Sequence, residues 1–312
     1  MKKPELIVIT GPTATGKSAI GVRLAKLTGG EIVSADSMQV YKYMDIGTAK
    51  PSLVEMDCVP HHMIDFISPL EDYSVALYVE DASRCVEDII RRGKQPIIVG
   101  GTGLYIDSLI TGQKFMIRGD SALRSKLEEE YDNTGGEAML KKLHAIDAAA
   151  AARLFANDKK RIVRALEAYE ITGKPISLHD LESKDHPPQY EAVRVALTYS
   201  DRADLYSKIE TRVDEMMQKG LINEVRSLLN MGVSRKNTSM QAIGYKELSG
   251  VIAGEADPGD ATDKIKMESR RYAKRQFTWL KRHKDMKWIV RDKSPDLDKD
   301  VHILMEYLNE TK

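Results

Sequence analysis

A glycine-rich loop near the amino terminus constrains the fold of this chain more than any other feature. Residues 11–18, GPTATGKS, fit the pattern G-x-x-x-x-G-K-[ST]. An apolar run at 5–10 precedes the loop, and an amphipathic stretch from Lys17 to Leu27 follows it. In that order of strand, loop and helix, backbone N–H groups and a helix N-terminus face an anion. The pattern therefore predicts a phosphate-binding loop in an α/β core, for a diphosphate or a triphosphate.

The residues of this loop predict how the phosphates are held. The expected diphosphate-binding residues are Gly11, Thr13, Ala14, Thr15, Gly16, Lys17 and Ser18. Lys17 should reach the terminal phosphates, and the Ser18 hydroxyl should ligate Mg²⁺, the one cofactor that we expect. Most P-loop NTPases also hold Mg²⁺ with an aspartate at the end of a later strand, whereas the strand at 95–99 ends in glycines. This difference disfavours an ATPase or a motor but leaves a small-molecule kinase open.

Strand and helix patterns predict the domain organisation. Strand patterns occur at 31–35, 95–101, 192–199 and 286–290, and helical patterns at 74–91, 202–230 and 262–283. Between about 116 and 186 the patterns are helical, without a convincing strand. We therefore expect an α/β fold with a P-loop NTPase-like parallel sheet, built from residues 1–115 and 189–312. An all-helical insertion domain at 116–188 interrupts it.

Composition excludes several classes of protein. The two cysteines, Cys58 and Cys85, form neither a disulfide framework nor a zinc ligand set. No apolar run approaches the roughly 20 residues that span a bilayer, and the amino-terminal run is too short for a signal peptide. We expect a cytoplasmic enzyme with no membrane partner. The 47 basic and 47 acidic residues balance, so a surface for a polyanion must come from local segregation of charge.

Five sequence blocks together resemble a known family. They are GPTATGKS (11–18), DSMQVYKYMDIGTAKP (36–51), VGGTGLY (99–105), MQAIGYKE (240–247) and RRYAKRQFTWLK (270–281). In this order, and over nearly the whole chain, they are similar to tRNA dimethylallyltransferases of the bacterial type. The resemblance implies Mg²⁺ dependence, dimethylallyl diphosphate as donor and the tRNA anticodon stem-loop as partner. The implied acceptor is N6 of adenosine 37, 3′ to the anticodon, in tRNAs that read codons beginning with U. We expect a monomer.

The resemblance also implies three catalytic residues. The carboxylate of Asp36 would accept a proton from the adenine amine, a step typically worth roughly 10²–10⁴ in rate; the alternative role is a Mg²⁺ ligand. Arg212 would stabilise the departing diphosphate, or it is a surface arginine paired with Glu215. Thr102 would contact the diphosphate or the tRNA, or it is a plain N-cap. Three further residues match the family without a role that follows from their chemistry: Asp45, Thr48 and Lys50.

An adenine stacked in an anticodon loop has to be extruded before it reacts, at a cost of a few kcal/mol. Residues 264–287 hold ten Lys or Arg against two acids, and phosphate contacts from such a surface would offset that cost. A solvated helix is the alternative. Arg271 and Arg275 share a helical face near Phe277 and Trp279. The resemblance implies tRNA contacts by Asp36, Ser37, Met38, Gln39, Thr102, Arg124, Lys160, Arg161, Ile162, Val163, Arg164, Gln241, Gly244, Arg271 and Arg275.

Three other functions stay open from the sequence. A related adenylate dimethylallyltransferase would act on a free nucleotide, although it would need neither the insertion nor the basic segment. A small-molecule kinase would use the same loop to bind ATP. A non-catalytic RNA-binding module would use the loop only as a structural switch.

Overall fold

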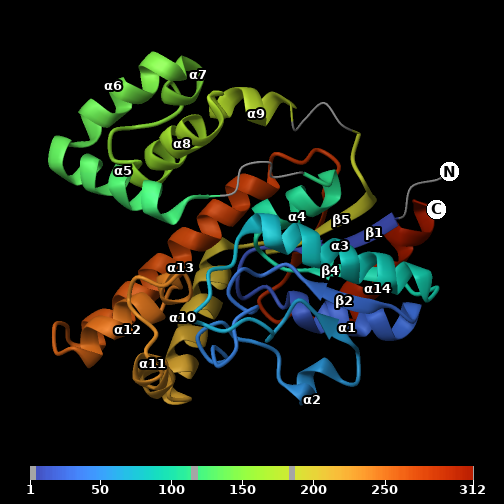
Figure 1. Cartoon of the computed structure of the whole chain (residues 1–312). Helices are drawn as coiled ribbons and strands as arrows, with labels where there is room; N and C mark the ends of the chain where they lie inside the picture. Colours follow the sequence, from blue (N-terminus) through green and yellow to red (C-terminus); the bar gives the residue numbers. More distant parts are fainter. Residues whose placement is uncertain (1–4, 114–118, 183–186, 312) are drawn as a thin grey trace. The chain divides into compact units, whose positions relative to one another are not determined.

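The computed structural model describes residues 5–113, 119–182 and 187–311, without the side chain of Glu182. The chain divides into two compact units. The larger unit comprises Met1–Gly112 and Gln189–Lys312, and the smaller unit comprises Gln113–Pro188. The green helices of Figure 1 belong to the smaller unit. The first expected domain boundary, near residue 116, falls outside the described residues.

Six parallel strands form the sheet of the larger unit, in the order β3-β2-β4-β1-β5-β6. In β1, Ile7 pairs with Ile97 on one side and with Val193 on the other. The chain therefore returns after the insertion to complete the same sheet, and the expected α/β class with a P-loop-like parallel sheet is confirmed. The strand bounds are β1 Glu5–Thr10, β2 Glu31–Ser34, β3 His61–His62, β4 Pro96–Val99, β5 Glu191–Tyr199 and β6 Lys287–Arg291.

Helices cover the sheet of the larger unit (Figure 1). α1 and α14 contact each other and share an apolar cluster with the strands. α3 packs on β2, where the Tyr78 hydroxyl donates to the carbonyl oxygen of Ser34, and on α4, where Tyr78 stacks on Tyr105. The bounds are α1 Lys17–Thr28, α2 Leu53–Met56, α3 Val75–Arg91, α4 Gly103–Thr111, α10 Arg202–Gln218, α11 Leu221–Asn230, α12 Tyr245–Ile252, α13 Pro258–Leu280 and α14 Leu297–Glu310; a 3₁₀ turn spans Ser239–Gln241.

Two helix boundaries differ from the sequence patterns. The pattern at 202–230 is divided into α10 and α11 at Gly220, whose φ of 95° is open to glycine but strained for other residues. α13 begins at Pro258, four residues before its apolar pattern. There the carboxylate of Asp257 accepts bonds from the N–H groups of Gly259 and Asp260, and proline suits the first helical position.

Helices are the only regular elements among the described residues of the smaller unit. It contains α5 Ser121–Thr134, α6 Gly136–Ile146, α7 Ala148–Ala151, α8 Lys159–Thr172 and α9 Ile176–Glu182. Its own apolar core includes Leu127 of α5, Leu143 of α6 and Ile162 and Leu166 of α8. In neither unit does a described helix combine the length and apolar character that a bilayer span requires.

Candidate active site

The phosphate loop connects β1 to α1, as its sequence predicts. Gly11 and Gly16 have φ angles of 145° and 78°, in the region that favours glycine. A Cβ atom on Gly11 would lie 2.6 Å from the carbonyl oxygen of Leu197, and one on Gly16 would lie 2.5 Å from Nη1 of Arg291. Only a bare backbone therefore fits at these two positions. Because α1 starts at Lys17, its N-terminus lies at the loop.

A buried ion pair supports the loop. Arg291, at the end of β6, donates from Nη1 to the carbonyl oxygen of Thr15 and, over 2.7 Å, from Nε to Oδ2 of Asp300. The side chains of Arg291 and Asp300 are each 6% exposed. Because a buried charge is stable only when it is paired, Asp300 on α14 holds the guanidinium against the loop. Sequence reasoning missed this pair, since 276 positions separate Arg291 from Thr15.

Lys17 and Ser18 both line a cavity of about 1340 Å³. The Lys17 ammonium donates to the carbonyl oxygen of Pro12 at 2.8 Å. Burial, followed by the positive charge of Arg212, lowers the pKa of Lys17 to about 8 against the opposing effect of the Asp36 carboxylate. A buried lysine whose pKa is lowered further by an arginine in the same cavity indicates a site for an anion.

Asp36 follows β2 and faces the same cavity as the phosphate loop. Its Oδ1 atom accepts bonds from the backbone N–H groups of Met38 at 2.9 Å and Gln39 at 3.3 Å. The carboxylate also lines a second cavity of about 290 Å³. Asp36 is therefore accessible from both cavities, with its orientation set by its own turn.

Thr102 stands at the N-cap position of α4, but its side chain does not cap that helix. Its hydroxyl oxygen accepts a bond from the N–H of Ser37 at 3.1 Å, and its own N–H donates to the carbonyl oxygen of Ala35. The plain N-cap alternative is therefore wrong for the side chain. Thr102 links the second glycine turn to the segment that carries Asp36.

Arg212 lies on α10, and its Nη1 atom is 3.5 Å from the hydroxyl oxygen of Thr13 in the phosphate loop. Burial lowers the pKa of its guanidinium, while the carboxylates of Asp36, Glu215 and Glu55 oppose that shift. Arg212 also lines both cavities. The interpretation as a surface arginine paired only with Glu215 is wrong, because the side chain is directed to the loop.

Two residues of α13 that the sequence did not single out complete the site. Gln276 accepts a bond from the N–H of Thr13 at 2.9 Å and donates to the carbonyl oxygen of Gly101 at 3.0 Å, so it joins the two glycine loops. Tyr272 lines both cavities. Burial and then the Asp36 charge raise the pKa of Tyr272 to about 12, and its hydroxyl bonds to Thr102 and Gln276. The spacing of four residues places Tyr272 and Gln276 on one helical face. The many basic residues of this segment, including Lys274 and Arg275 between the two, obscured that pattern in the sequence.

The predicted tRNA-binding residues of the larger unit converge only in part. Those that line the smaller cavity come from three segments: Asp36, Ser37, Met38, Gln241, Gly244 and Arg275. Gln39 lines the larger cavity instead. Arg271 is exposed and pairs with Glu268.

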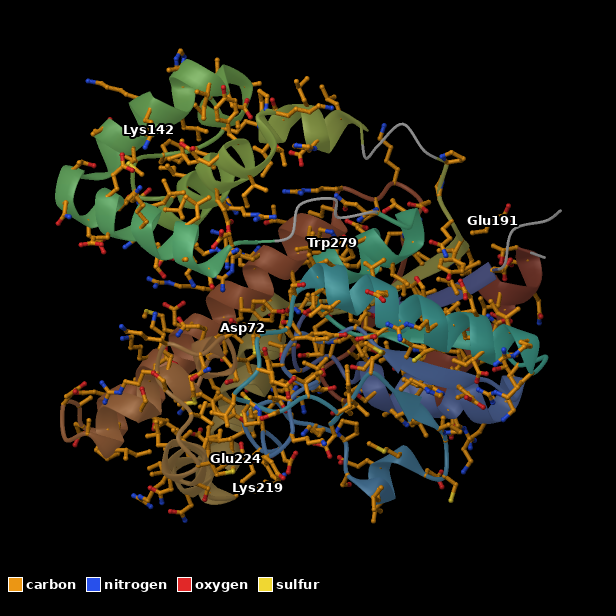
Figure 2. The ribbon with its side chains drawn as sticks, viewed as in Figure 1. Asp72, Lys142, Glu191, Lys219, Glu224 and Trp279 are labelled. Atoms are coloured by element: carbon orange, nitrogen blue, oxygen red, sulfur yellow. The ribbon has the colours of Figure 1, made fainter. Side chains whose placement is uncertain are left out.

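The aromatic residues near these arginines are partly buried and contact other parts of the larger unit. Phe277 stacks on Trp288 with ring centroids 6.0 Å apart. The indole N–H of Trp279, labelled in Figure 2, donates to Oδ2 of Asp107 at 2.6 Å. Both rings therefore serve packing within the larger unit.

In the smaller unit the predicted tRNA-binding residues have different environments. Lys160 and Arg161 are exposed. Ile162 and Val163 are 0% and 1% exposed within the apolar core, so the expectation that their side chains meet RNA is corrected: the apolar face of α8 holds them inside. Arg124 and Arg164 both pair with Glu167, whose side chain is fully buried. Since a buried carboxylate requires such partners, these two arginines stabilise the unit.

Comparisons with known proteins give a consistent result. Residues 39–283 match the family model described as IPP transferase, and residues 4–66 match one described as isopentenyl transferase. The tRNA dimethylallyltransferase of Caldanaerobacter subterraneus subsp. tengcongensis is 46% identical over 306 residues, 97% of each chain. That of Carboxydothermus hydrogenoformans is 50% identical over 285 residues, 91% of each chain.

Two solved structures resemble the fold. The full-length tRNA isopentenylpyrophosphate transferase of Bacillus halodurans has a TM-score of 0.73 and 40% identity, and the alignment covers 99% of this chain and 96% of that one. A eukaryotic dimethylallyltransferase acting on tRNA has a TM-score of 0.80 and 28% identity, with 98% and 80% covered.

Proposed function

This chain belongs to the IPP transferase family, and from that premise we propose that it transfers a dimethylallyl group from dimethylallyl diphosphate to tRNA. The acceptor is N6 of adenosine 37, 3′ to the anticodon, in tRNAs that read codons beginning with U. The products are N6-(dimethylallyl)adenosine and diphosphate. One observation carries the proposal: the carboxylate of Asp36 lines both the cavity of the phosphate loop and the smaller cavity beside it.

In this reaction N6 attacks the allylic carbon of the donor, and the bond from that carbon to the diphosphate oxygen breaks. The diphosphate leaves with the bonding electrons, while the proton lost by N6 passes to Asp36. Because two backbone N–H groups hold Oδ1 of Asp36, the base is oriented before the acceptor arrives. The charges of Lys17 and Arg212 stabilise the negative charge that develops on the leaving group.

Ser18 fits the metal that the family implies. Its hydroxyl is exposed on the first turn of α1 and lines the same cavity as Lys17. Mg²⁺ usually binds through few protein ligands together with phosphate oxygens and water, so one hydroxyl beside the phosphate loop suits it. When bound, Mg²⁺ supplies further positive charge to the leaving diphosphate.

Exposed basic residues support binding of the anticodon stem-loop. They are Lys160 and Arg161 in the smaller unit and Arg271 and Arg275 on α13. Each phosphate that they neutralise releases counterions, which offsets the few kcal/mol needed to unstack adenosine 37. We assign the enzyme to the cytoplasm, where its substrate is found. A monomer suffices, because every group named above comes from one chain; sedimentation equilibrium tests this state.

Mass spectrometry tests the proposal. Unmodified tRNA is incubated with the enzyme, Mg²⁺ and dimethylallyl diphosphate, and adenosine monophosphate is offered in a parallel reaction. A gain of one C₅H₈ unit on adenosine of the tRNA is expected, with none on the free nucleotide. Modification of the nucleotide alone would support the adenylate dimethylallyltransferase. A third reaction, with labelled ATP and candidate small acceptors in place of the prenyl donor and tRNA, tests for a kinase, which phosphate transfer would support.

A further inference from the structure

The segment 45–50, which we call the DIGTAK loop, is held by an unusual anchor. The backbone N–H groups of Asp45 and Ile46 donate to Oε2 of Glu224 at 2.9 and 2.8 Å, and that of Gly47 donates to Oε1 at 3.1 Å. Glu224 lies on α11 (Figure 2), 177 to 179 positions further along the chain. Bonds from N–H groups to an ionised carboxylate are stronger than those between neutral groups, so one side chain fixes three successive peptide units.

The anchor is itself held in place. The hydroxyl of Tyr245, at the start of α12, donates to Oε1 of Glu224 at 2.6 Å. Tyr245 is fully buried, and burial, with the Glu224 charge, raises the pKa of its hydroxyl well above the usual value. Its ring packs so closely on Gly47 that a Cβ atom there would lie 2.4 Å from Cε2. The carboxylate therefore accepts four bonds, two at each oxygen.

The DIGTAK loop is in turn connected to the catalytic turn. The side-chain amide of Gln39 donates to the carbonyl oxygens of Thr48 and Ala49, each at 3.2 Å. The backbone N–H of the same Gln39 is one of the two donors that hold Oδ1 of Asp36. A continuous set of hydrogen bonds thus runs from Glu224 through the loop and Gln39 to Asp36.

The same loop forms part of the smaller cavity. Gly47 and Thr48 line it together with Asp36 and Ser37. The DIGTAK loop also lines the larger cavity, through Asp45, Ile46, Thr48, Ala49 and Lys50. The phosphate loop has separate supports there, in Arg291 and Gln276. Release of the DIGTAK loop would therefore displace Asp36 and the wall of the smaller cavity, while the diphosphate site keeps its own bonds.

We propose that Glu224 is a positioning residue for the transfer step: it holds the DIGTAK loop so that Gln39 orients the carboxylate of Asp36 toward the acceptor. This inference rests on the proposed function, because it assigns Glu224 to the same reaction. A misplacement of about 1 Å at a reacting group can lower a rate on the order of 100-fold. Removal of the anchor should therefore lower kcat by roughly 10- to 100-fold and leave the KM for dimethylallyl diphosphate within about twofold.

Two substitutions distinguish anchoring from bulk stability. Glu224→Ala leaves a space for a small carboxylate, so added formate should restore much of the lost kcat. Glu224→Gln should lower kcat equally and should not respond to formate. The glutamine side chain fills the space, and in either orientation of its amide the NH₂ group faces groups that are themselves hydrogen-bond donors. The matched control is Glu80→Ala, which removes an exposed carboxylate of α3 paired with Arg84; it should retain wild-type rates with and without formate.

Hydrogen exchange supplies a readout that does not depend on the reaction. The amides of residues 45–47 should exchange at least about 10-fold faster in Glu224→Ala, and formate should slow them again. Wild-type kcat in Glu224→Ala, or unchanged exchange, would overturn the inference. A parallel loss of kcat and donor affinity without formate rescue would also overturn it, since that result indicates general destabilisation. If the wild-type protein does not prenylate tRNA, the proposed function fails, and exchange at 45–47 still decides whether Glu224 anchors the loop.

Discussion

Raising the pH from 7 to 9 should discharge Lys17 in the free protein, because burial and Arg212 hold its pKa near 8. With that pKa, about nine-tenths of the Lys17 side chains are charged at pH 7 and about one-tenth at pH 9. Only the charged form attracts the diphosphate. The value of kcat/KM for the donor, which reports groups of the free enzyme, should therefore fall about 10-fold across this interval.

Stability should change in the opposite direction. The pKa of Lys17 is about 8 in the folded protein, against 10.5 for an unperturbed lysine, which is the value expected in the unfolded chain. Between these values the unfolded chain binds more protons, so the free energy of unfolding rises with pH. The gain is at most about 3 kcal/mol, from 1.36 kcal/mol per unit of pKa, and less where water in the open cavity already solvates the charge.

Single-turnover prenylation at low donor and saturating tRNA measures kcat/KM for the donor. Urea unfolding without donor measures the free energy of unfolding. Lys17→Arg is the control: its guanidinium stays charged across this range, so its slower reaction should lose the decline between pH 7 and 9. The reasoning is refuted by a wild-type profile that stays flat to pH 10. It is also refuted by a decline that persists in Lys17→Arg.

Three other substitutions test separate parts of the site. The amide of Asp36→Asn can still accept the hydrogen bonds from its own turn but cannot accept a proton. The value of kcat should therefore fall roughly 10²- to 10⁴-fold, while filter binding shows unchanged tRNA affinity. Transfer near the wild-type rate would contradict the assignment of Asp36 as the base. Gln276→Leu removes the hydrogen-bond partners of Thr13 and Gly101, so it should lower the free energy of unfolding by about 1–3 kcal/mol and raise the KM for the donor. Urea unfolding and initial rates measure these two quantities. Unchanged values would show that Gln276 does not join the two glycine loops. Arg291→Met leaves Asp300 buried and unpaired and should destabilise the protein by about 3–5 kcal/mol. Removing Asp300 as well should restore stability in thermal unfolding but not donor affinity, and recovery of both would exclude a role in loop support.

Local pattern was sufficient for several features of this protein. The phosphate loop could be predicted because its strand, glycines and helix are contiguous, so that one short segment contains all the groups that face the anion. The family resemblance indicated Asp36 as a site residue, and its position beside the loop follows because parallel strands end at the same edge of a sheet. In α8, Ile162 and Leu166 are four positions apart and both belong to the apolar core of the smaller unit, so the helical period is sufficient to explain the burial of Ile162.

The supports of the site depended on tertiary structure. Gln276 lies 263 positions from its partner Thr13, and Glu224 lies 179 positions from Asp45. A glutamine or glutamate on a helix has many possible partners, and spacing along a chain does not indicate which one folding will bring within 3 Å. The residues of the phosphate loop that face the anion are thus adjacent in sequence and could be identified from it. The anchor of residues 45–47 on Glu224 forms only when α11 and α12 pack against the DIGTAK loop, because hydrogen bonds require proximity in space.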